Sequence, residues 1–523
     1  MALMPTLSGQ AIAIGCLLLP FLGAFLSALL PVLARWLALL CCAATAFMAA
    51  AITLGALQLG AFSSGGSTAG VWPGAIELLG PYGVSLQVDD VAMPFLLLNG
   101  LVGGAVLLDG WRRLPPGPFL PLLMVLHGGL NSAFVATDLI SLYVTLEVVG
   151  VSAFLLILIN RSERSLWVAL RYLLIGNTVM TLYLIGAAVV YVQTGSFQLG
   201  AVAATTGGAA LALLLVGLLT KSGLFLSGLW LPLTHAESPA VVSALLSGVV
   251  VTSGIAPLLR LSVAIPALHG VIPAIGLASA ALGLLFALVD QEVKRMLAWS
   301  TLSQMGLVVL APAVGGIYAL GHGVAKAVLF LSARRFPARD LAGWKSRPLP
   351  PGVWAPLWIA SLSVVGLPPL LGFTAKYQLD KAISTPMGLV VSVLTVGTVA
   401  VYCRLLGAPL SRPKLGTPPP QEGEPEWSAG VVLLLGALLV LGVALLGLEV
   451  GNGLQGESAS RALALATSSG KTALVLLAGL GLHRLLEPWR RWGNLALPKL
   501  EGFTDLIGGI GLVGAGLLVM LSQ

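Results

Sequence analysis

Five ionisable side chains lie inside stretches that otherwise have the composition of membrane-spanning helices. They are Glu147, Lys221, His322, Lys326 and Lys376. In the core of a bilayer an ionisable group costs at least about 2.5–3.5 kcal/mol on insertion scales, so such residues usually have a function. A file of acids and bases at that depth can pass protons from one to the next. The sequence therefore predicts a chain that moves charge.

The first two of these residues are expected to form a pair. Glu147 lies about nine residues beyond Asp138, where its span begins, and is therefore roughly 13 Å deep in a hydrocarbon core about 30 Å thick. A lone carboxylate at that depth would take up a proton, whereas a nearby lysine would let it stay charged. Lys221 is the natural candidate. The alternative is a structural salt bridge that carries no protons.

The other three residues form the second part of the file. His322 and Lys326 are four positions apart and so share one face of a helix. An imidazole exchanges protons near neutral pH, which suits a relay with the lysine. For His322 alone, a neutral packed histidine is an equally good interpretation. Lys376 directly follows a break in its helix, much as Lys221 precedes one.

Two spans contain the residues that interrupt helices. One holds Gly366-Leu-Pro-Pro-Leu-Leu-Gly372, and the other runs through Leu231-Pro-Leu-Thr-His-Ala-Glu-Ser-Pro239. Proline removes a backbone donor, so broken helices persist in a membrane where protein or a wet cavity surrounds them. Breaks at matching places in two halves are typical of inverted-repeat transporters. His235 and Glu237, inside the second sequence, could pair with each other or line an entrance.

Composition excludes a soluble globule. Hydrophobic residues make up 57% of the 523 residues and charged residues only 9%, against about 25% in soluble domains. The net charge of +7 does not indicate a nucleic-acid partner, because lysine and arginine occur in short clusters between apolar runs. The partner that this composition does indicate is the lipid bilayer.

The apolar runs divide the chain into roughly sixteen segments long enough to span a bilayer. They lie near 10–32, 36–57, 92–110, 117–135, 138–159, 166–192, 207–227, 239–263, 267–289, 297–313, 316–334, 353–379, 385–407, 428–450, 461–486 and 503–521. The expected fold is an all-α polytopic membrane protein of about 14–16 transmembrane helices, with two inverted five-helix repeats and broken helices. We expect N-terminal helices over 1–110, a first repeat over 111–263, a second over 264–410 and C-terminal helices over 411–523.

Basic residues predict which side each end faces. Clusters such as Arg161/Arg164 and Lys294/Arg295 follow odd-numbered spans, whereas the connections over 58–90 and 193–206 carry no lysine or arginine. Since positive residues collect in the cytoplasm, the N-terminus is expected outside it. Charged residues at the ends of spans, including Asp138, Asp290, Lys294 and Arg295, are expected to be solvated or to anchor to lipid.

No cofactor motif is found in the sequence. The cysteines Cys16, Cys41, Cys42 and Cys403 are scattered in apolar runs without ligand spacing. Phosphate-binding, dinucleotide, haem and iron–sulfur patterns are absent from the sequence, so we expect neither a cofactor nor a metal.

Several motifs, in order along residues 85–410, resemble one family of membrane proteins. They include Leu218-Leu-Thr-Lys-Ser-Gly-Leu-Phe, Trp230-Leu-Pro-Leu-Thr-His-Ala-Glu-Ser-Pro, Asp290-Gln-Glu-Val-Lys-Arg-Met-Leu-Ala-Trp-Ser, His322-Gly-Val-Ala-Lys and Gly366-Leu-Pro-Pro-Leu-Leu-Gly-Phe-Thr-Ala-Lys. The chain thus resembles the antiporter-like subunits of respiratory complex I and the large subunits of Mrp sodium/proton antiporters.

The resemblance implies a fourteen-helix core that transfers protons along a central polar axis. Glu147 and Lys221 would be the pair of the first half-channel, Lys326 the connecting lysine and Lys376 the terminal lysine. Other membrane subunits of a hetero-oligomeric complex are the implied partners, and sodium is a second candidate ion. The implied location of the protein is a cell membrane, which the chain crosses many times. This membrane is either an inner or plasma membrane or one of thylakoid type.

The chain departs from the family pattern at three places. Thr252 stands where relatives often have a lysine or histidine, Tyr318 where they have a first histidine, and Pro232-Leu233 replaces the usual Pro-Asp. The link between the half-channels would then use water, hydroxyls and His322. Thr252 and Tyr318 are therefore secondary pathway candidates, together with His235 and Glu237.

Three functions remain open from the sequence. The first is a proton-translocating, antiporter-like subunit. The second is a membrane-arm subunit of an NAD(P)H–quinone oxidoreductase of the complex I type, with no redox centre of its own. The third is a scaffold with a vestigial channel, which the residues at Thr252 and Tyr318 would explain.

Overall fold

The computed structural model describes most of the chain as helix. It covers residues 4–58, 76–111, 117–344, 347–410, 428–451, 458–491, 497–498 and 500–522. Residues 59–75, which belong to the connection over 58–90 that carries no lysine or arginine, lie outside the described residues.

The long helices follow the order of the expected spans. They are α1 (Met4–Leu29), α2 (Ala34–Gln58), α3 (Ala92–Gly110), α4 (Phe119–Val135), α5 (Leu139–Ile157), α6 (Glu163–Thr194), α7 (Gly208–Lys221), α8 (Leu231–Glu237), α9 (Ala240–Leu245), α10 (Thr252–Ala264), α11 (Leu268–Val289), α12 (Val293–Val308), α13 (Pro312–Ser332), α14 (Pro351–Val365), α15 (Leu371–Ala382), α16 (Thr385–Leu406), α17 (Ala429–Gly451), α18 (Ser458–Arg491) and α19 (Phe503–Leu521).

Shorter elements connect these helices. They are the antiparallel strands β1 (Ile76–Glu77) and β2 (Ser85–Leu86), the π-helix η6 (Leu246–Val250), and the 3-10 helices η2 (Gly80–Tyr82), η3 (Leu158–Asn160), η4 (Leu199–Ala204), η5 (Phe225–Gly228), η7 (Ala333–Arg335) and η8 (Leu341–Trp344).

The described helices long enough to span a membrane are fewer than the 14–16 expected, and shorter apolar helices make up the difference. Among the described residues, 11 helices are long and apolar enough to cross a membrane, or 12 if the bent pair of α7 with η5 and α8 is one span. Three shorter apolar helices, Leu18–Leu29, Phe119–Val135 and Pro351–Val365, bring the total into the expected range of 14–16. The chain is therefore an all-α polytopic membrane protein.

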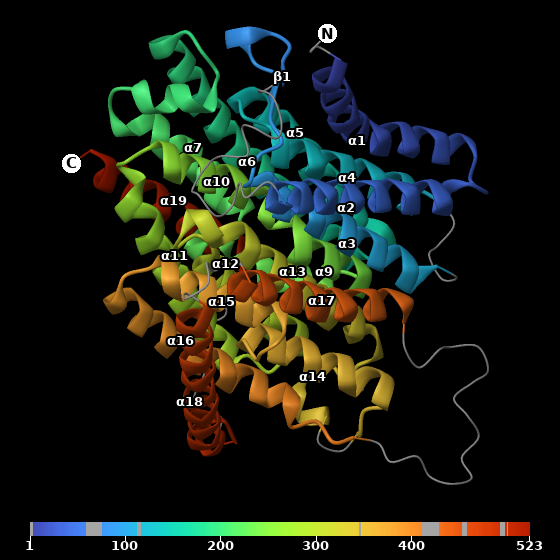
Figure 1. Cartoon of the computed structure of the whole chain (residues 1–523), viewed down its shortest axis with the longest axis vertical. Coiled ribbons are helices and arrows are strands. Elements are labelled where there is room, and N and C mark those ends of the chain that lie inside the picture. Colours follow the sequence, from blue (N-terminus) through green and yellow to red (C-terminus); the bar gives the residue numbers. More distant parts are fainter. Residues whose placement is uncertain are drawn as a thin grey trace.

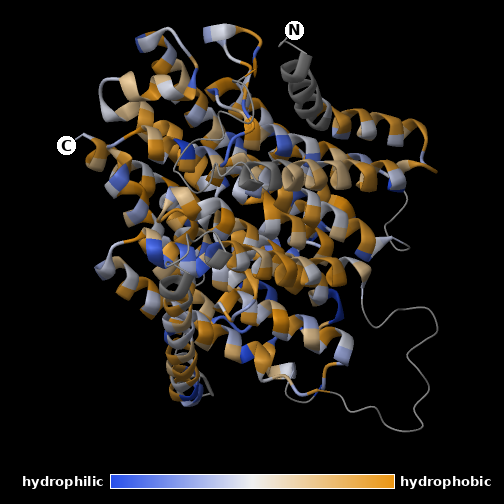
Figure 2. Ribbon diagram, in the orientation of Figure 1, coloured by the Kyte–Doolittle hydropathy of each residue, from blue (hydrophilic) through white to orange (hydrophobic). Residues whose placement is uncertain are grey.

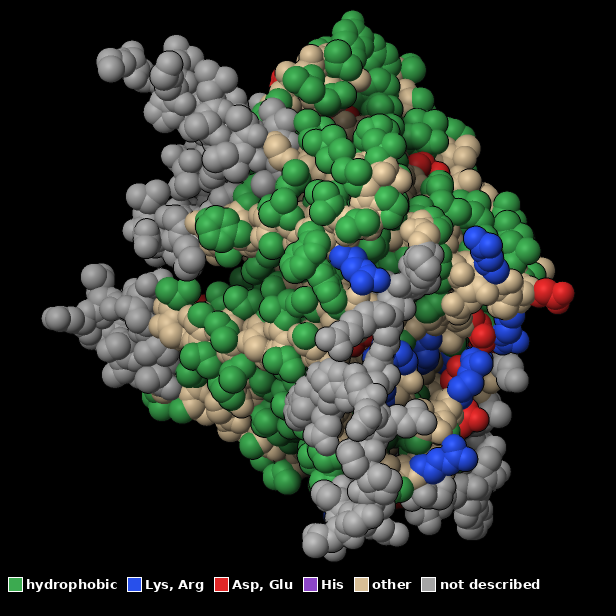
Figure 3. Space-filling model, turned by 90° about the vertical axis from the view of Figure 1, so that its right-hand side faces the viewer, with side chains coloured by type: hydrophobic (Ala, Val, Ile, Leu, Met, Phe, Trp, Pro, Cys, Tyr) green, Lys and Arg blue, Asp and Glu red, His purple; other side chains and the backbone are tan. Residues whose placement is uncertain are grey.

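The outer surface is apolar, as a lipid-facing surface must be. Hydrophobic residues follow the outer helices in Figure 2, and large side chains such as Val192 and Phe47 are 83% and 76% exposed. Figure 3 shows one face covered mostly by hydrophobic side chains, with lysine, arginine and acidic residues gathered toward one edge. Such a continuous apolar surface needs lipid or other membrane helices against it.

In the first broken helix, the first segment, α7, ends at Lys221. Gly223 has a φ of +63°, which an L side chain rarely adopts, and the two segments on either side of the break are bent by 42°. The indole nitrogen of Trp230 donates a hydrogen bond of 2.8 Å to the carbonyl of Thr220. Ser279 on α11 accepts the backbone N–H of Phe225 at 3.0 Å. The polar backbone groups that the break frees thus find partners inside the protein.

The second break separates α14 from α15. Gly366 ends α14 with a φ of +100° and so supplies the left-handed cap. The backbone N–H of Gly372, on the far side of the break, donates to the Ser363 hydroxyl at 3.3 Å. The break expected at Gly366–Gly372 is therefore present. The other expectation was wrong in position: Leu231–Glu237 forms the helix α8, because Pro232 lies in its first turn where no N–H is needed, and the bend lies earlier, at Gly223.

The sequence interpretation of Asp138 was wrong. The side chain is fully buried and caps the start of α5, where it accepts the backbone N–H groups of Ile140 and Ser141. Its second oxygen accepts the N–H of Ser85 in β2 at 2.7 Å. The carboxylate is stabilised by these three backbone N–H donors, two of them at the N-terminus of the helix. Protein contacts therefore take the place of the solvent that the sequence analysis expected around it.

Candidate functional site

Glu147 and Lys221 meet across the interface between α5 and α7. The ammonium of Lys221 lies 3.7 Å from a carboxylate oxygen of Glu147 and donates 3.2 Å to the carbonyl of Leu146. The lysine side chain is 8% exposed and the glutamate 24%, so the pair is largely withdrawn from the surface. This is the pairing that the sequence analysis expected.

The surroundings of this pair leave room for the lysine. A Cβ atom on Gly150 would lie 2.9 Å from the Lys221 ammonium, and one on Gly176 would lie 3.5 Å from it. With its nitrogen turned toward the carboxylate, the Asn177 amide donates to the second oxygen of Glu147 at 3.1 Å. Glycines on α5 and α6 therefore make space for the ammonium, and an amide fixes the glutamate.

Lys326 is fully buried, and no carboxylate of the described residues forms an ion pair with it. Its ammonium donates 2.7 Å to the carbonyl of Leu297 and 2.8 Å to the hydroxyl of Ser300, both on α12. Ser300 shares a hydrogen bond of 2.9 Å with the Tyr402 hydroxyl, and the ammonium lies 5.6 Å from the centre of the Tyr402 ring. Lys326 is thus held by neutral oxygens and one aromatic face.

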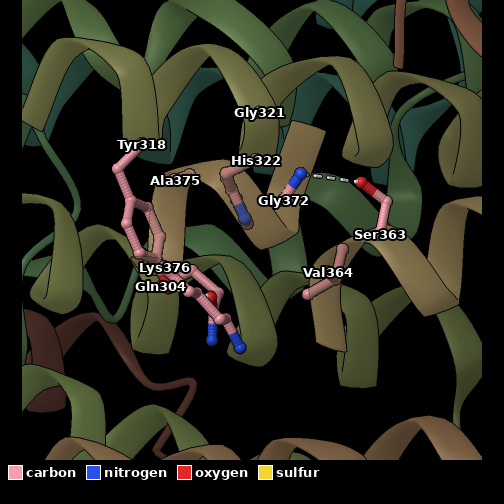
Figure 4. A pocket seen from close by; sticks show the side chains of 9 residues that line it. All are labelled: Gln304, Tyr318, Gly321, His322, Ser363, Val364, Gly372, Ala375 and Lys376. Carbon is pink, nitrogen blue, oxygen red and sulfur yellow. Dashed lines mark hydrogen bonds between the residues drawn. The ribbon is translucent and has the colours of Figure 1, made fainter. Parts of the chain in front are cut away.

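His322 and Lys376 line one small cavity, shown in Figure 4. Both ring nitrogens of His322 lack a hydrogen-bond partner within the described part of the chain. Lys376 donates 3.0 Å to the carbonyl of Val365 at the C-terminal end of α14, where the helix dipole favours a cation. The cavity brings together the expected middle and final members of the file.

Tyr318 lies at the same cavity and connects it to further polar groups. Its hydroxyl donates 2.9 Å to the amide oxygen of Gln304. The Gln304 nitrogen in turn donates 3.4 Å to the hydroxyl of Thr398 on α16. The Tyr318 hydroxyl therefore belongs to a polar row that continues through Gln304 to Thr398.

Thr252 makes no such connection. Its hydroxyl donates 2.6 Å to the carbonyl of Val249, one turn earlier in its own helical region. A different hydroxyl pair lies between the two expected repeats: the hydroxyl oxygens of Ser247 in η6 and Thr301 in α12 are 2.8 Å apart. Thr301 also donates to the carbonyl of Leu297, which accepts from Lys326 as well.

His235 and Glu237 do not bind each other. His235 is fully buried, and its Nδ1 lies 2.8 Å from the carbonyl of Leu231. Glu237 instead pairs with Arg164 at 2.8 Å and with Arg339 at 2.9 Å. Of the two arrangements expected for this region, the mutual pair is wrong.

Arg339 links several elements at one end of the molecule. It bonds Glu292 at 2.7 Å, at the start of α12, in addition to Glu237 at the end of α8. The hydrogen bond to Glu292, reinforced by Glu237, raises the pKa of the Arg339 guanidinium above its ordinary value. Lys294, expected to be solvated, donates to the carbonyls of Ala236 and Ser238 and so caps the broken helix.

Sequence reasoning missed the neutral polar residues around the lysines. Asn177, Ser300, Gln304 and Thr301 carry no charge and are unremarkable in a hydropathy profile. The only sequence signal that they belong to the site is an amide or hydroxyl within an apolar span. That signal can be recognised only when it is known which face of the helix points inward. Among the residues that the structure describes, no three histidine, cysteine or acidic side chains could hold a metal ion together.

Known proteins and one protein family match a large part of the chain. A family described as NADH:quinone oxidoreductase/Mrp antiporter, transmembrane, matches residues 136–401. NADH-quinone oxidoreductase subunit 14 of Thermus thermophilus is 34% identical over 379 residues, covering 69% of this chain and 84% of that protein. An NADH-quinone oxidoreductase subunit of Desulforudis audaxviator is 32% identical, with 57% of this chain and 66% of that one covered. A Na(+)/H(+) antiporter subunit of Alkalihalophilus pseudofirmus is 28% identical, with shares of 57% and 67%.

Solved structures have the same fold. A chain of respiratory complex I from Thermus thermophilus superposes with a TM-score of 0.66 at 26% identity, covering 82% of this chain and 97% of that one. A chain of the Mrp complex from Dietzia gives a TM-score of 0.69 at 23% identity, with shares of 96% and 59%. The protein therefore belongs to the NADH:quinone oxidoreductase/Mrp antiporter family of membrane subunits.

Proposed function

We propose that this chain is the proton-translocating, antiporter-like subunit of a hetero-oligomeric membrane complex. The observation that carries the proposal is the withdrawn ion pair of Glu147 and Lys221, 3.7 Å apart beside a broken helix. Lys326 and the cavity of His322 and Lys376 continue the polar file into the second half.

The proposed mechanism is electrostatic. At an effective dielectric constant near 20, two charges about 4 Å apart interact by about 4 kcal/mol. The charged form of Lys221 is stabilised while Glu147 stays beside it, and separation of the pair removes that stabilisation. The proton then moves toward Lys326, whose ammonium donates to two neutral oxygens, the Leu297 carbonyl and the Ser300 hydroxyl.

Proton flux in vesicles tests this mechanism. The assembled complex is reconstituted with a pH-sensitive dye, and Lys221→Ala and Glu147→Gln are compared with the unaltered protein. Loss of an interaction of about 4 kcal/mol is expected to reduce flux by two orders of magnitude or more. Arg161→Ala, a change at the exposed residue that follows η3, is the control. Flux that survives both pair variants unchanged would refute the mechanism and favour the scaffold interpretation.

The membrane and the division of the chain are part of the same proposal. We place the subunit in an inner, plasma or thylakoid-type membrane with its N-terminus outside the cytoplasm. The repeats run over 111–263 and 264–410, flanked by helices at 1–110 and 411–523. The matching breaks beside Lys221 and Lys376 support this division.

A second candidate is a membrane-arm subunit of a quinone oxidoreductase of the complex I type. It is favoured by the 34% identity to a quinone oxidoreductase subunit, compared with 28% to an antiporter subunit. Purification of the native complex separates the two candidates. Hydrophilic iron–sulfur subunits in the purified assembly would identify the redox type, and an assembly of membrane subunits alone would identify the antiporter type.

A further inference from the structure

The C-terminal helix α19 lies along the first broken helix. Near the start of α7, a Cβ atom on Gly208 would lie 2.6 Å from the Cβ of Leu521. Further along, a Cβ on Gly514 would lie 3.4 Å from a methyl carbon of Val216. Because residue numbers rise on one helix as they fall on the other, α19 runs antiparallel to α7 in close contact.

The contact continues past the break. A Cβ on Gly509 would lie 2.7 Å from the carbonyl oxygen of Leu226, which belongs to η5 on the other side of the break. The helix α19 is continuous from Phe503 to Leu521. One unbroken helix therefore rests on both segments of a broken one.

Arg171 joins the start of α19 to the same region. Its guanidinium donates 2.6 Å to the carbonyl of Glu501 and 3.4 Å to the carbonyl of Leu229, which follows η5. The residue is only 5% exposed. Arg295, on α12, makes a close ion pair with the carboxylate of Glu501. Two arginines from different elements thus hold the beginning of α19 beside the broken helix.

The contact face of α19 is separate from the proton pathway. Leu506, Val513 and Leu517 are buried against the chain, while Leu512 on another face is 67% exposed. On α7, Val216 faces α19, and Lys221 lies five positions later, roughly 140° around the helix. The lysine therefore points toward α5 and α6, away from α19.

We propose that α19 and Arg171 position Lys221 by holding the two segments of the broken helix in a fixed relation throughout transport. The charge at Lys221 then moves by rotation of its side chain, while the backbone at Ser222–Leu224 keeps its bend. Arg171 is a positioning residue in this arrangement and touches no proton carrier. The proposal rests on the proton-translocating function, which the first experiment tests separately.

A reversible cross-link tests whether α19 stays in place. Val216→Cys and Gly514→Cys are combined in a background without the natural cysteines. A Cβ atom at position 514 would lie 3.4 Å from a methyl carbon of Val216, an ordinary contact distance that brings the two side chains within reach of a disulfide, whose Cβ atoms are typically about 3.5–4.5 Å apart. The cross-link is expected to form in membranes with a mild oxidant, and flux in the oxidised state should stay within about twofold of the reduced state. Flux that is lost on oxidation and restored by reduction would overturn the proposal, because α19 would then have to move.

Arginine variants test the positioning role itself. Arg171→Ala is expected to lower flux about tenfold and to shift its pH profile, since Lys221 would lose its fixed distance to Glu147. Arg171→Lys, which keeps a donor, should recover part of the flux, and Arg161→Ala should leave both readings unchanged. An Arg171→Ala profile of unchanged shape contradicts a positioning role. The yield of the cross-link depends only on geometry. A complex that cross-links but shows no flux would therefore refute the proton-translocating function, while the docking of α19 on the broken helix would still stand.

Discussion

At the scale of residues, the space around the Lys221 ammonium is as important as its charge. Gly150→Ala would put a methyl group 2.9 Å from the ammonium, which must then move away from Glu147. Because misplacement of about 1 Å can cost on the order of a hundredfold in rate, we expect flux to fall tenfold or more. Gly176→Ala is the matched control, since its methyl group would lie at an ordinary contact distance of 3.5 Å. Flux in vesicles is the measurement, and equal flux for the two variants would contradict the prediction.

At the scale of elements, the hydroxyls of Ser247 in η6 and Thr301 in α12 form a contact between the two expected repeats, whereas Thr252 does not. Thr301→Val keeps the shape of the side chain but removes its bond to Ser247, and we expect flux to fall severalfold with a loss of stability of only about 1 kcal/mol. Thr252→Val removes a hydroxyl that bonds within its own helical region, and should leave flux nearly unchanged. Thermal unfolding and flux are measured on both. The reverse order of effects would make Thr252 the link.

The element α18 shows what hydropathy leaves open. The sequence predicts a span over 461–486, and a helix is found there, with Leu463–Pro488 apolar enough to cross a membrane. In Figure 1, however, α18 runs across the direction shared by α2 and α17. The composition of a segment indicates that a helix forms in apolar surroundings. The direction of that helix depends on the neighbours against which it packs.

At the scale of the whole molecule, the side that each end faces can be tested by labelling. Ala204→Cys and Arg161→Cys place thiols on the exposed connections at opposite ends of α6. With the N-terminus outside the cytoplasm, an impermeant maleimide added to intact cells should label position 204, and position 161 only after permeabilisation. The opposite labelling pattern would reverse the orientation and with it the side from which protons enter.

The sequence by itself determined the class of the protein, the break at Gly366–Gly372 and which charged residues lie inside the spans, whereas the position of the first break, at Gly223, came from the structure. What the sequence determined follows from local properties: apolar length, the missing N–H of proline, and the cost of a charge in lipid. The tertiary structure decided which groups meet. It placed Glu237 with Arg339 instead of His235, made Asp138 a buried cap, and put Ser247 and Thr301 where Thr252 was expected to serve. Which side chains meet depends on how each helix is rotated and packed against its neighbours. No short stretch of sequence specifies that.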